Sequence, residues 1–164
     1  MTAPLGYLIT WTTYGTWLHG DERGWVESGV YGIQPPDPQR LAIASGRMTA
    51  PAVTLGAAQR QVVEATIRQH CRVWGWELHA VNVRSNHVPV VVNADRTPEE
   101  VMRQFKAWCS RRLTEAEGPS KEGKPPKDGA RRWWTEHGST KWINDEEYLE
   151  NAVRYVTEGQ DVRR

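Results

Sequence analysis

The block that most constrains the fold is residues 57–113, where two helix-like segments enclose two strand-like ones. Residues 57–74 repeat apolar side chains at three- and four-residue spacing, which predicts an amphipathic helix, and Gly75 is well placed to end it. Residues 76–84 alternate apolar and polar side chains, and residues 87–92 are a short, mainly apolar run. Both are expected to be strands.

Short polar stretches mark the ends of these segments. Ser85 and Asn86 are a candidate tight turn, which makes the two strands an antiparallel hairpin. Further on, Thr97 reads as a helix cap, Pro98 takes the first helical position, and Glu100 completes a capping box. A second helix is therefore expected to begin there.

The remaining elements lie at the two ends of the chain. Residues 5–14 are rich in aromatic and β-branched side chains and predict a strand, and residues 140–143 are a short strand candidate. Residues 144–147 form a second capping box that opens a final helix, which is expected to run to about Glu158 and to end at Gly159.

The resulting order is β-α-β-β-α-β with an extra C-terminal helix. This α+β order matches the ferredoxin-like split arrangement, an antiparallel sheet in which the first and third strands are the inner pair. The strand that begins at His87 would then lie centrally. A length of 164 residues predicts a single domain over residues 1–164. Within it, residues 15–55 are expected as a long loop insertion and residues 117–130 as a flexible loop.

Composition excludes few functions. Lys and Arg nearly balance Asp and Glu, with a net charge of +1, so the overall charge neither indicates nor excludes a nucleic-acid partner. No apolar run approaches the roughly 20 residues that cross a bilayer, and the N-terminus does not resemble a signal peptide. We therefore expect a cytoplasmic protein without a membrane segment, and Cys71 and Cys109 as buried, reduced thiols.

The local charge is uneven. Residues 103–132 contain nine Lys or Arg and four Asp or Glu, a local net charge of +5. This stretch is either a solvated helix and loop or a phosphate-binding surface with two tryptophans as stacking partners. The candidate DNA-binding residues are Arg103, Lys106, Arg111, Arg112, Arg131, Arg132, Trp133 and Trp134.

The last helix carries the remaining candidate for chemistry. Tyr148 and Tyr155 are seven residues apart and share a face. They are either residues at the rim of the core, or one phenol is a nucleophile. Tyrosine attack on a phosphodiester requires a cation to polarise the phosphoryl oxygens, because a phenol is a poor nucleophile near neutral pH. A strand with histidines two residues apart would supply two imidazoles on one face.

Two segments carry a resemblance to a known family. The strand run Asn86-His87-Val88-Pro89-Val90-Val91-Val92 resembles the Asn-His-hydrophobe-His run of the single-tyrosine HUH transposases, which include the REP-associated tyrosine transposases and insertion-sequence transposases. The final segment Tyr155-Val156-Thr157-Glu158-Gly159-Gln160 resembles that family's tyrosine helix, with a glutamine a few residues further on.

The resemblance implies a function and a set of site residues. Such proteins are ferredoxin-like homodimers that bind single-stranded DNA hairpins, and their tyrosine cuts one strand with Mg²⁺ or Mn²⁺ through a 5′-phosphotyrosine link. Carried over, Tyr155 is the nucleophile, His87 the first metal ligand and Gln160 a further ligand. Pro89 stands where the family has its second histidine, and proline offers a metal no side-chain donor.

Three hypotheses follow from the sequence. The first is a transposase or nickase with a metal site that is impaired, or rebuilt with His79, His19 or Glu158. The second is a catalytically inactive hairpin-binding module on the same fold. The third is a ferredoxin-like domain unrelated to DNA.

Overall fold

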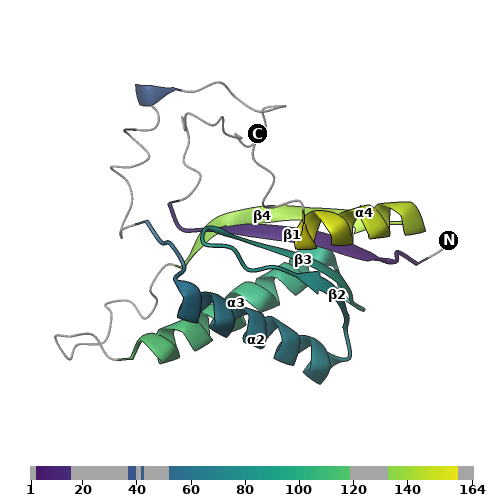
Figure 1. Cartoon of the computed structure of the whole chain (residues 1–164), viewed down its shortest axis with the longest axis horizontal. Helices are drawn as coiled ribbons and strands as arrows, with labels where there is room; N and C mark the ends of the chain where they lie inside the picture. The colour runs from purple at the N-terminus through teal and green to yellow at the C-terminus, as the bar shows by residue number, and fades with distance from the viewer. Residues whose placement is uncertain (1–2, 16–36, 40–41, 43–51, 119–132, 159–164) are drawn as a thin grey trace.

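The computed structural model describes residues 3–15, 37–39, 42, 52–118 and 133–158 (Figure 1). In chain order the elements are β1 (Gly6–Thr13), α2 (Ala57–Trp74), β2 (Glu77–Val81), β3 (His87–Asn93), α3 (Pro98–Glu117), β4 (Trp134–Ile143) and α4 (Glu146–Thr157). No helix in these ranges is long and apolar enough to cross a membrane.

The four strands form one sheet in the order β2-β3-β1-β4, and every neighbouring pair is antiparallel. Strands β1 and β3 are the inner pair, with Ile9 opposite Val90 and Trp11 opposite Val88. Helices α2 and α3 cover one face of the sheet, and α4 lies on the other (Figure 1). The predicted fold class, with its extra C-terminal helix, is confirmed.

Two hydrophobic clusters of unequal size hold these layers together. The larger lies between the sheet and helices α2 and α3, and its fully buried side chains include Trp11, Ile67 and Phe105. The smaller lies under α4 and is centred on Val91 and Val156. Because side chains alternate along a strand, β3 contributes to both clusters and has one face for each.

The ends of the first helix agree with the sequence prediction, and the start of the second agrees in part. Gly75 ends α2 in the left-handed conformation, with φ of 71° and its N–H bonded to the Cys71 carbonyl. At the start of α3 the Thr97 hydroxyl accepts from the Glu100 N–H at 3.3 Å. The Glu100 carboxylate, however, accepts from Arg103 at 2.6 and 2.8 Å. The second bond of the predicted capping box, from the Thr97 N–H to the Glu100 carboxylate, is therefore replaced by an ion pair between Glu100 and Arg103.

Helix α4 begins one residue later than its predicted capping box. Asp145 is the cap, and its carboxylate accepts from the Tyr148 N–H at 2.7 Å. The helix continues to Thr157, close to the expected end, whereas Gly159 lies outside the described residues. Asn144, the first residue of the predicted box, is therefore not the cap.

Strand β2 is shorter than predicted because of its partner. The sequence suggested a strand over residues 76–84, but β2 ends at Val81. The Asn82 N–H donates to the Pro89 carbonyl at 3.3 Å, and proline has no N–H to donate in return. The pairing of β2 and β3 therefore loses a hydrogen bond at this point, whereas Thr10 on β1 still faces Pro89 in register.

Strand β4 is longer than predicted, ten residues rather than the four of 140–143. Its first part is polar, contains a glycine and lies at the edge of the sheet. Polar residues and glycine are not typical of strands, so the sequence carries no strand signal there. Gly138 is required by close packing. A Cβ there would lie 2.6 Å from the Met102 sulfur of α3 and 2.8 Å from the Thr10 carbonyl oxygen.

The expected loop insertion, residues 15–55, lies mostly outside the described residues. Its final part is well packed, which the sequence interpretation missed. Val53 and Leu55 are buried in the large cluster, and their N–H groups donate to the carbonyls of Tyr14 and Ser85. In the second expected loop, 117–130, the structure describes only residues 117 and 118.

Candidate active site and nucleic-acid interface

The first site residue, His87, opens the inner strand β3. It lies opposite Thr12 of β1, and Pro89 lies opposite Thr10. Strand alternation places both on the same face as Val91, whose side chain belongs to the small cluster under α4. His87 and Pro89 therefore face the α4 side of the sheet; their two-residue spacing predicted a shared face but not which side of the sheet it is.

A neighbouring amide orients the His87 ring. Nδ1 of His87 lies 2.8 Å from Oδ1 of Asn86. An amide oxygen only accepts hydrogen bonds, so Nδ1 carries the proton in the neutral ring and Nε2 keeps its lone pair. This tautomer is the one suited to binding a cation or accepting a proton through Nε2.

A short row of hydroxyl groups adjoins His87. Thr12, the cross-strand partner of His87, donates from its hydroxyl to the Thr135 hydroxyl at 2.9 Å. Thr135 in turn donates to the Thr13 carbonyl at 3.0 Å. Beside the candidate histidine the sheet therefore offers neutral hydrogen-bonding groups from two further strands.

The candidate nucleophile, Tyr155, lies on the last turn of α4 and is 47% exposed. The helix packs on β2 and β3 through Ala152 and Val156. At its end the Asn82 side-chain amide donates to the Val156 carbonyl at 2.9 Å. Since the Asn82 backbone also bonds Pro89, the last turn of α4 is fixed beside the part of β3 that carries Pro89. Tyr155 and His87 thus belong to the same side of the sheet.

The metal ion that the resemblance to HUH transposases implies is a poor fit to the described residues on this side of the sheet. Within the described ranges, no three His, Cys, Asp or Glu side chains come together as a metal-binding group. His87 has a suitable nitrogen, Pro89 has no donor, and Gln160 lies outside the described residues. Two alternative ligands suggested by the sequence, His79 and Glu158, do not complete such a group, and His19 also lies outside these residues.

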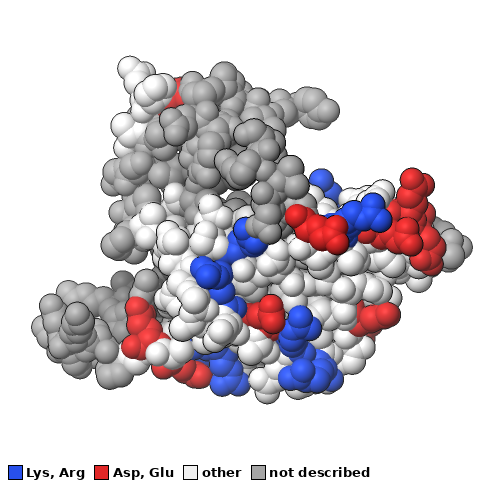
Figure 2. Space-filling model, viewed as in Figure 1, with Lys and Arg blue, Asp and Glu red and all other residues white. Residues whose placement is uncertain are grey.

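The candidate DNA-binding residues divide into three groups. Arg131 and Arg132 lie outside the described residues. Arg103, Arg111 and Arg112 are exposed on α3, where Arg103 pairs with Glu100 and Arg112 with Glu115. Figure 2 shows basic and acidic side chains interspersed over most of this view, and acidic ones gathered at the start of α4.

The third group has structural roles. Trp133 is 1% exposed and donates its indole N–H to the Thr114 hydroxyl, so it has no open face for a base. The expectation that it stacks on DNA is wrong. Trp134 is half-buried, and its N–H donates to the Lys106 carbonyl. Lys106 donates to the carbonyls of Thr135 and Glu136, and its burial lowers the pKa of its ammonium group.

Two solved structures are similar to this one. A REP-associated tyrosine transposase bound to a REP hairpin aligns with a TM-score of 0.52 and 13% identity, over 95% of this chain and 68% of that one. A candidate transposase from Deinococcus radiodurans R1 aligns with a TM-score of 0.46 and 16% identity, over 99% of this chain and 95% of that one. No family model and no curated protein matches the sequence. The first comparison shows that the chain has the fold of a tyrosine transposase.

Proposed function

We propose that this protein is a transposase-like DNA-binding protein that recognises single-stranded DNA hairpins, and that Tyr155 is its strand-cleaving nucleophile with activity reduced by Pro89. The observation that carries the proposal is the position of Tyr155. Its phenol is half-exposed at the end of α4, on the side of the sheet where His87 opens β3, in a fold shared with a tyrosine transposase.

A DNA hairpin is the proposed partner for two reasons. The similar transposase is bound to a REP hairpin, and the shared fold spans 95% of the present chain. In addition, the sheet face beside α4 carries His87 and the hydroxyl groups of Thr12 and Thr135, which could donate to phosphate oxygens in place of their present acceptors, the Thr135 hydroxyl and the Thr13 carbonyl.

The proposed reaction is a transesterification. The Tyr155 oxygen attacks the phosphorus, a phosphorus–oxygen bond to tyrosine forms, and the bond to the 3′-oxygen breaks. The phenol loses its proton to a base, and the leaving 3′-oxygen gains one. The products are a 5′-phosphotyrosine link and a free 3′-hydroxyl, so no oxidant or further reactant is needed.

Cleavage is expected to be slow because the described residues do not fit the Mg²⁺ or Mn²⁺ ion that the family uses. A proline at position 89 removes one of the imidazoles that would hold such an ion, and we therefore assign no step to a metal. The same residue favours a second candidate function, a catalytically inactive module that binds hairpins without cutting them.

A single polypeptide can form this site. Helix α4 packs on strands β2 and β3 of its own chain, and Asn82 holds its end there. The proposed homodimer is therefore not required to bring Tyr155 to the His87 side of the sheet. We propose a site formed in cis, with dimerisation as a separate property.

The test is a cleavage assay on a labelled single-stranded hairpin with Mn²⁺ present. Wild type is expected to cut slowly, and Tyr155→Phe is expected to abolish both cutting and the covalent protein–DNA product. Tyr148→Phe is the matched control, because it removes the other tyrosine hydroxyl from α4. Tight binding without cleavage would select the inactive module. An absence of salt-sensitive affinity for single-stranded DNA would exclude both functions.

A further inference from the structure

A groove with two exposed tryptophans lies between helices α2 and α3, on the side of the sheet away from α4. Trp74 at the end of α2 is 47% exposed, Trp108 on α3 is 36% exposed, and Val73 beside them is 73% exposed. Together with His70 and Arg112 they line a volume of about 180 Å³. We call it the Trp74–Trp108 groove. Exposed rings of this size are costly to leave in water, which suggests a binding role.

The His70 ring lies close to both tryptophans. Its centroid is 6.1 Å from that of Trp74 and 6.3 Å from that of Trp108. The imidazole itself is buried, and it also contacts Trp76 and Phe105 edge-on at 5.2 and 5.8 Å. The groove is therefore backed by a ring that belongs to the core.

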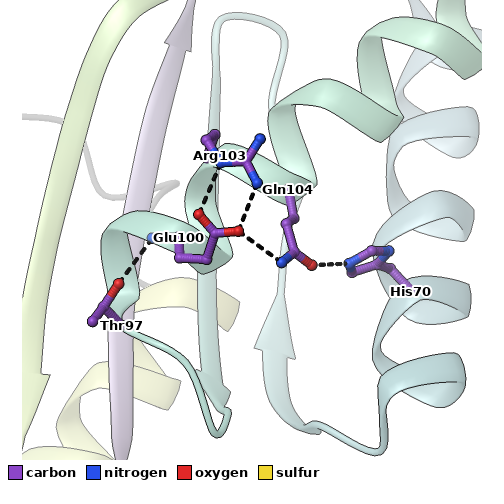
Figure 3. Close-up of polar contacts among 5 residues, drawn as sticks. All are labelled: His70, Thr97, Glu100, Arg103 and Gln104. Carbon is purple, nitrogen blue, oxygen red and sulfur yellow. Dashed lines mark hydrogen bonds and ion pairs between the residues drawn. The ribbon is translucent and has the colours of Figure 1, made fainter.

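A chain of polar contacts fixes that ring (Figure 3). Nε2 of His70 lies 2.8 Å from Oε1 of Gln104, and the Gln104 amide nitrogen donates to Glu100 at 3.0 Å. Glu100 is held in turn by Arg103. Because each member has a defined partner, the His70 ring at the back of the groove is held in place before any ligand arrives, which lowers the entropy cost of binding.

The electrostatics of the groove favour an anionic partner. The Arg96 guanidinium lies 5.6 Å from the Trp74 ring centroid. Those of Arg111 and Arg112 lie 4.5 and 5.8 Å from the Trp108 centroid. An arginine guanidinium thus lies beside each exposed tryptophan ring. Glu115, which pairs with Arg112, offsets part of the positive charge of these arginines.

These charges distinguish among three kinds of occupant. A second copy of the chain joined through a two-fold axis at this groove would bring arginines against arginines, which disfavours self-association. A cationic ligand would meet the same repulsion. A nucleic acid strand fits both features, since a base can stack on a tryptophan ring where an arginine now lies, and its phosphates are counterions for that arginine.

We propose that the Trp74–Trp108 groove binds an unpaired base of single-stranded DNA, with the neighbouring phosphates on Arg96 and Arg111. The proposal rests on the proposed function in that DNA is the ligand. It adds a second contact surface across the sheet from Tyr155, so a strand would be held by one face and cut at the other. Base stacking accepts any sequence, so the groove would anchor an unpaired tail and would not read the hairpin.

The experiment compares two DNA probes by fluorescence anisotropy, a blunt hairpin and the same hairpin with an unpaired oligothymidine tail. The tail is expected to strengthen wild-type binding. Trp108→Ala and Trp74→Ala should each reduce affinity for the tailed probe about tenfold and leave the blunt probe unchanged. Arg111→Gln should weaken binding of the tailed probe. It should also reduce the slope of log affinity against log salt concentration by about one, as expected for the loss of one phosphate contact.

Two controls accompany these variants. Trp142→Ala removes a tryptophan that is 49% exposed on β4, outside the groove, and should bind both probes as wild type does. Trp108→Phe keeps an aromatic face and should retain most of the tail affinity. Circular dichroism checks that every variant is folded.

The outcomes separate the groove from the proposed function. If the blunt hairpin binds but the tryptophan variants bind the tailed probe like wild type, the groove proposal fails and the proposed function stands. If wild type binds neither probe, both fail. If Trp108→Ala instead converts a dimer into a monomer in light scattering with DNA affinity unchanged, the groove is a self-association surface and the proposal is overturned.

Discussion

The two faces of the sheet share the same strands but differ in how much they bury. Under α2 and α3 lies a large cluster with fully buried aromatic rings, including Trp11 and Phe105. Under α4 only a few small aliphatic side chains are buried, such as Val91 and Val156. One face therefore supplies most of the stability, and the other carries the half-buried polar side chains of Thr12, His87 and Thr135. Pro89 lies on the more thinly packed of the two faces.

Core truncations test this difference and should have the largest effect. Phe105→Ala on the α2–α3 side should lower the free energy of unfolding by roughly 3–5 kcal/mol, because it removes a large buried ring. Val156→Ala on the α4 side should cost only about 2 kcal/mol, because fewer buried carbons are lost. Urea denaturation of both variants measures the difference. Equal losses would mean that α4 is as much a part of the core as α3 is.

Pro89→His tests whether the α4 face is an altered metal site. A histidine there would face the same side as His87, so Mn²⁺ affinity should rise at least about tenfold, which corresponds to about 1.4 kcal/mol. Calorimetric titration with Mn²⁺ measures the affinity, and the hairpin assay measures any gain in cutting.

Pro89→Ala is the control for that change. Both variants restore a backbone N–H that can donate to Asn82, so both should extend β2 and slow amide exchange there. Only the histidine variant should gain metal affinity. If neither variant binds Mn²⁺ better than wild type, His87 and residue 89 do not form a metal site.

The smallest expected effect concerns the polar chain behind the Trp74–Trp108 groove. Hydrogen bonds from Arg103 and Gln104 lower the pKa of Glu100 from 4.5 to about 2. Because its pKa is lower in the folded chain than in the unfolded chain, ionised Glu100 stabilises the fold above about pH 4.5, and this contribution is lost as the pH falls towards 2. Glu100→Gln should thus lower Tm by about one degree at neutral pH and by less in acid.

Glu147→Gln is the matched control for Glu100, because both acids lie in the first turn of a helix and feel its dipole. Thermal unfolding at neutral and acidic pH compares the two variants. A pH-independent effect of Glu100→Gln would show that its charge does not act through Arg103.

The sequence predicted features that depend on local pattern. Helix α2 has the predicted bounds because its apolar spacing and Gly75 are both local signals. That His87 and Pro89 share a face followed from strand alternation alone. The topology followed from the order of elements, because few arrangements connect them without crossing.

Features that depend on a distant partner were not predictable. Where β2 ends is decided by Pro89 on the neighbouring strand, and the length of β4 by its pairing with β1. Trp133 and Trp134 are adjacent in sequence and both rings bond to α3, but only the first is fully buried. The groove between Trp74 and Trp108 arises from the packing of two helices, and no periodicity in either one marks it.

The double role of Asn82 has a mechanical consequence. Its backbone N–H holds the Pro89 carbonyl, its side chain holds the end of α4, and Pro89 cannot return a hydrogen bond to it. The residue therefore joins the part of β3 that carries Pro89 to the end of the helix that carries Tyr155. A ligand that displaces this part of β3 would therefore also displace the end of α4 that carries Tyr155.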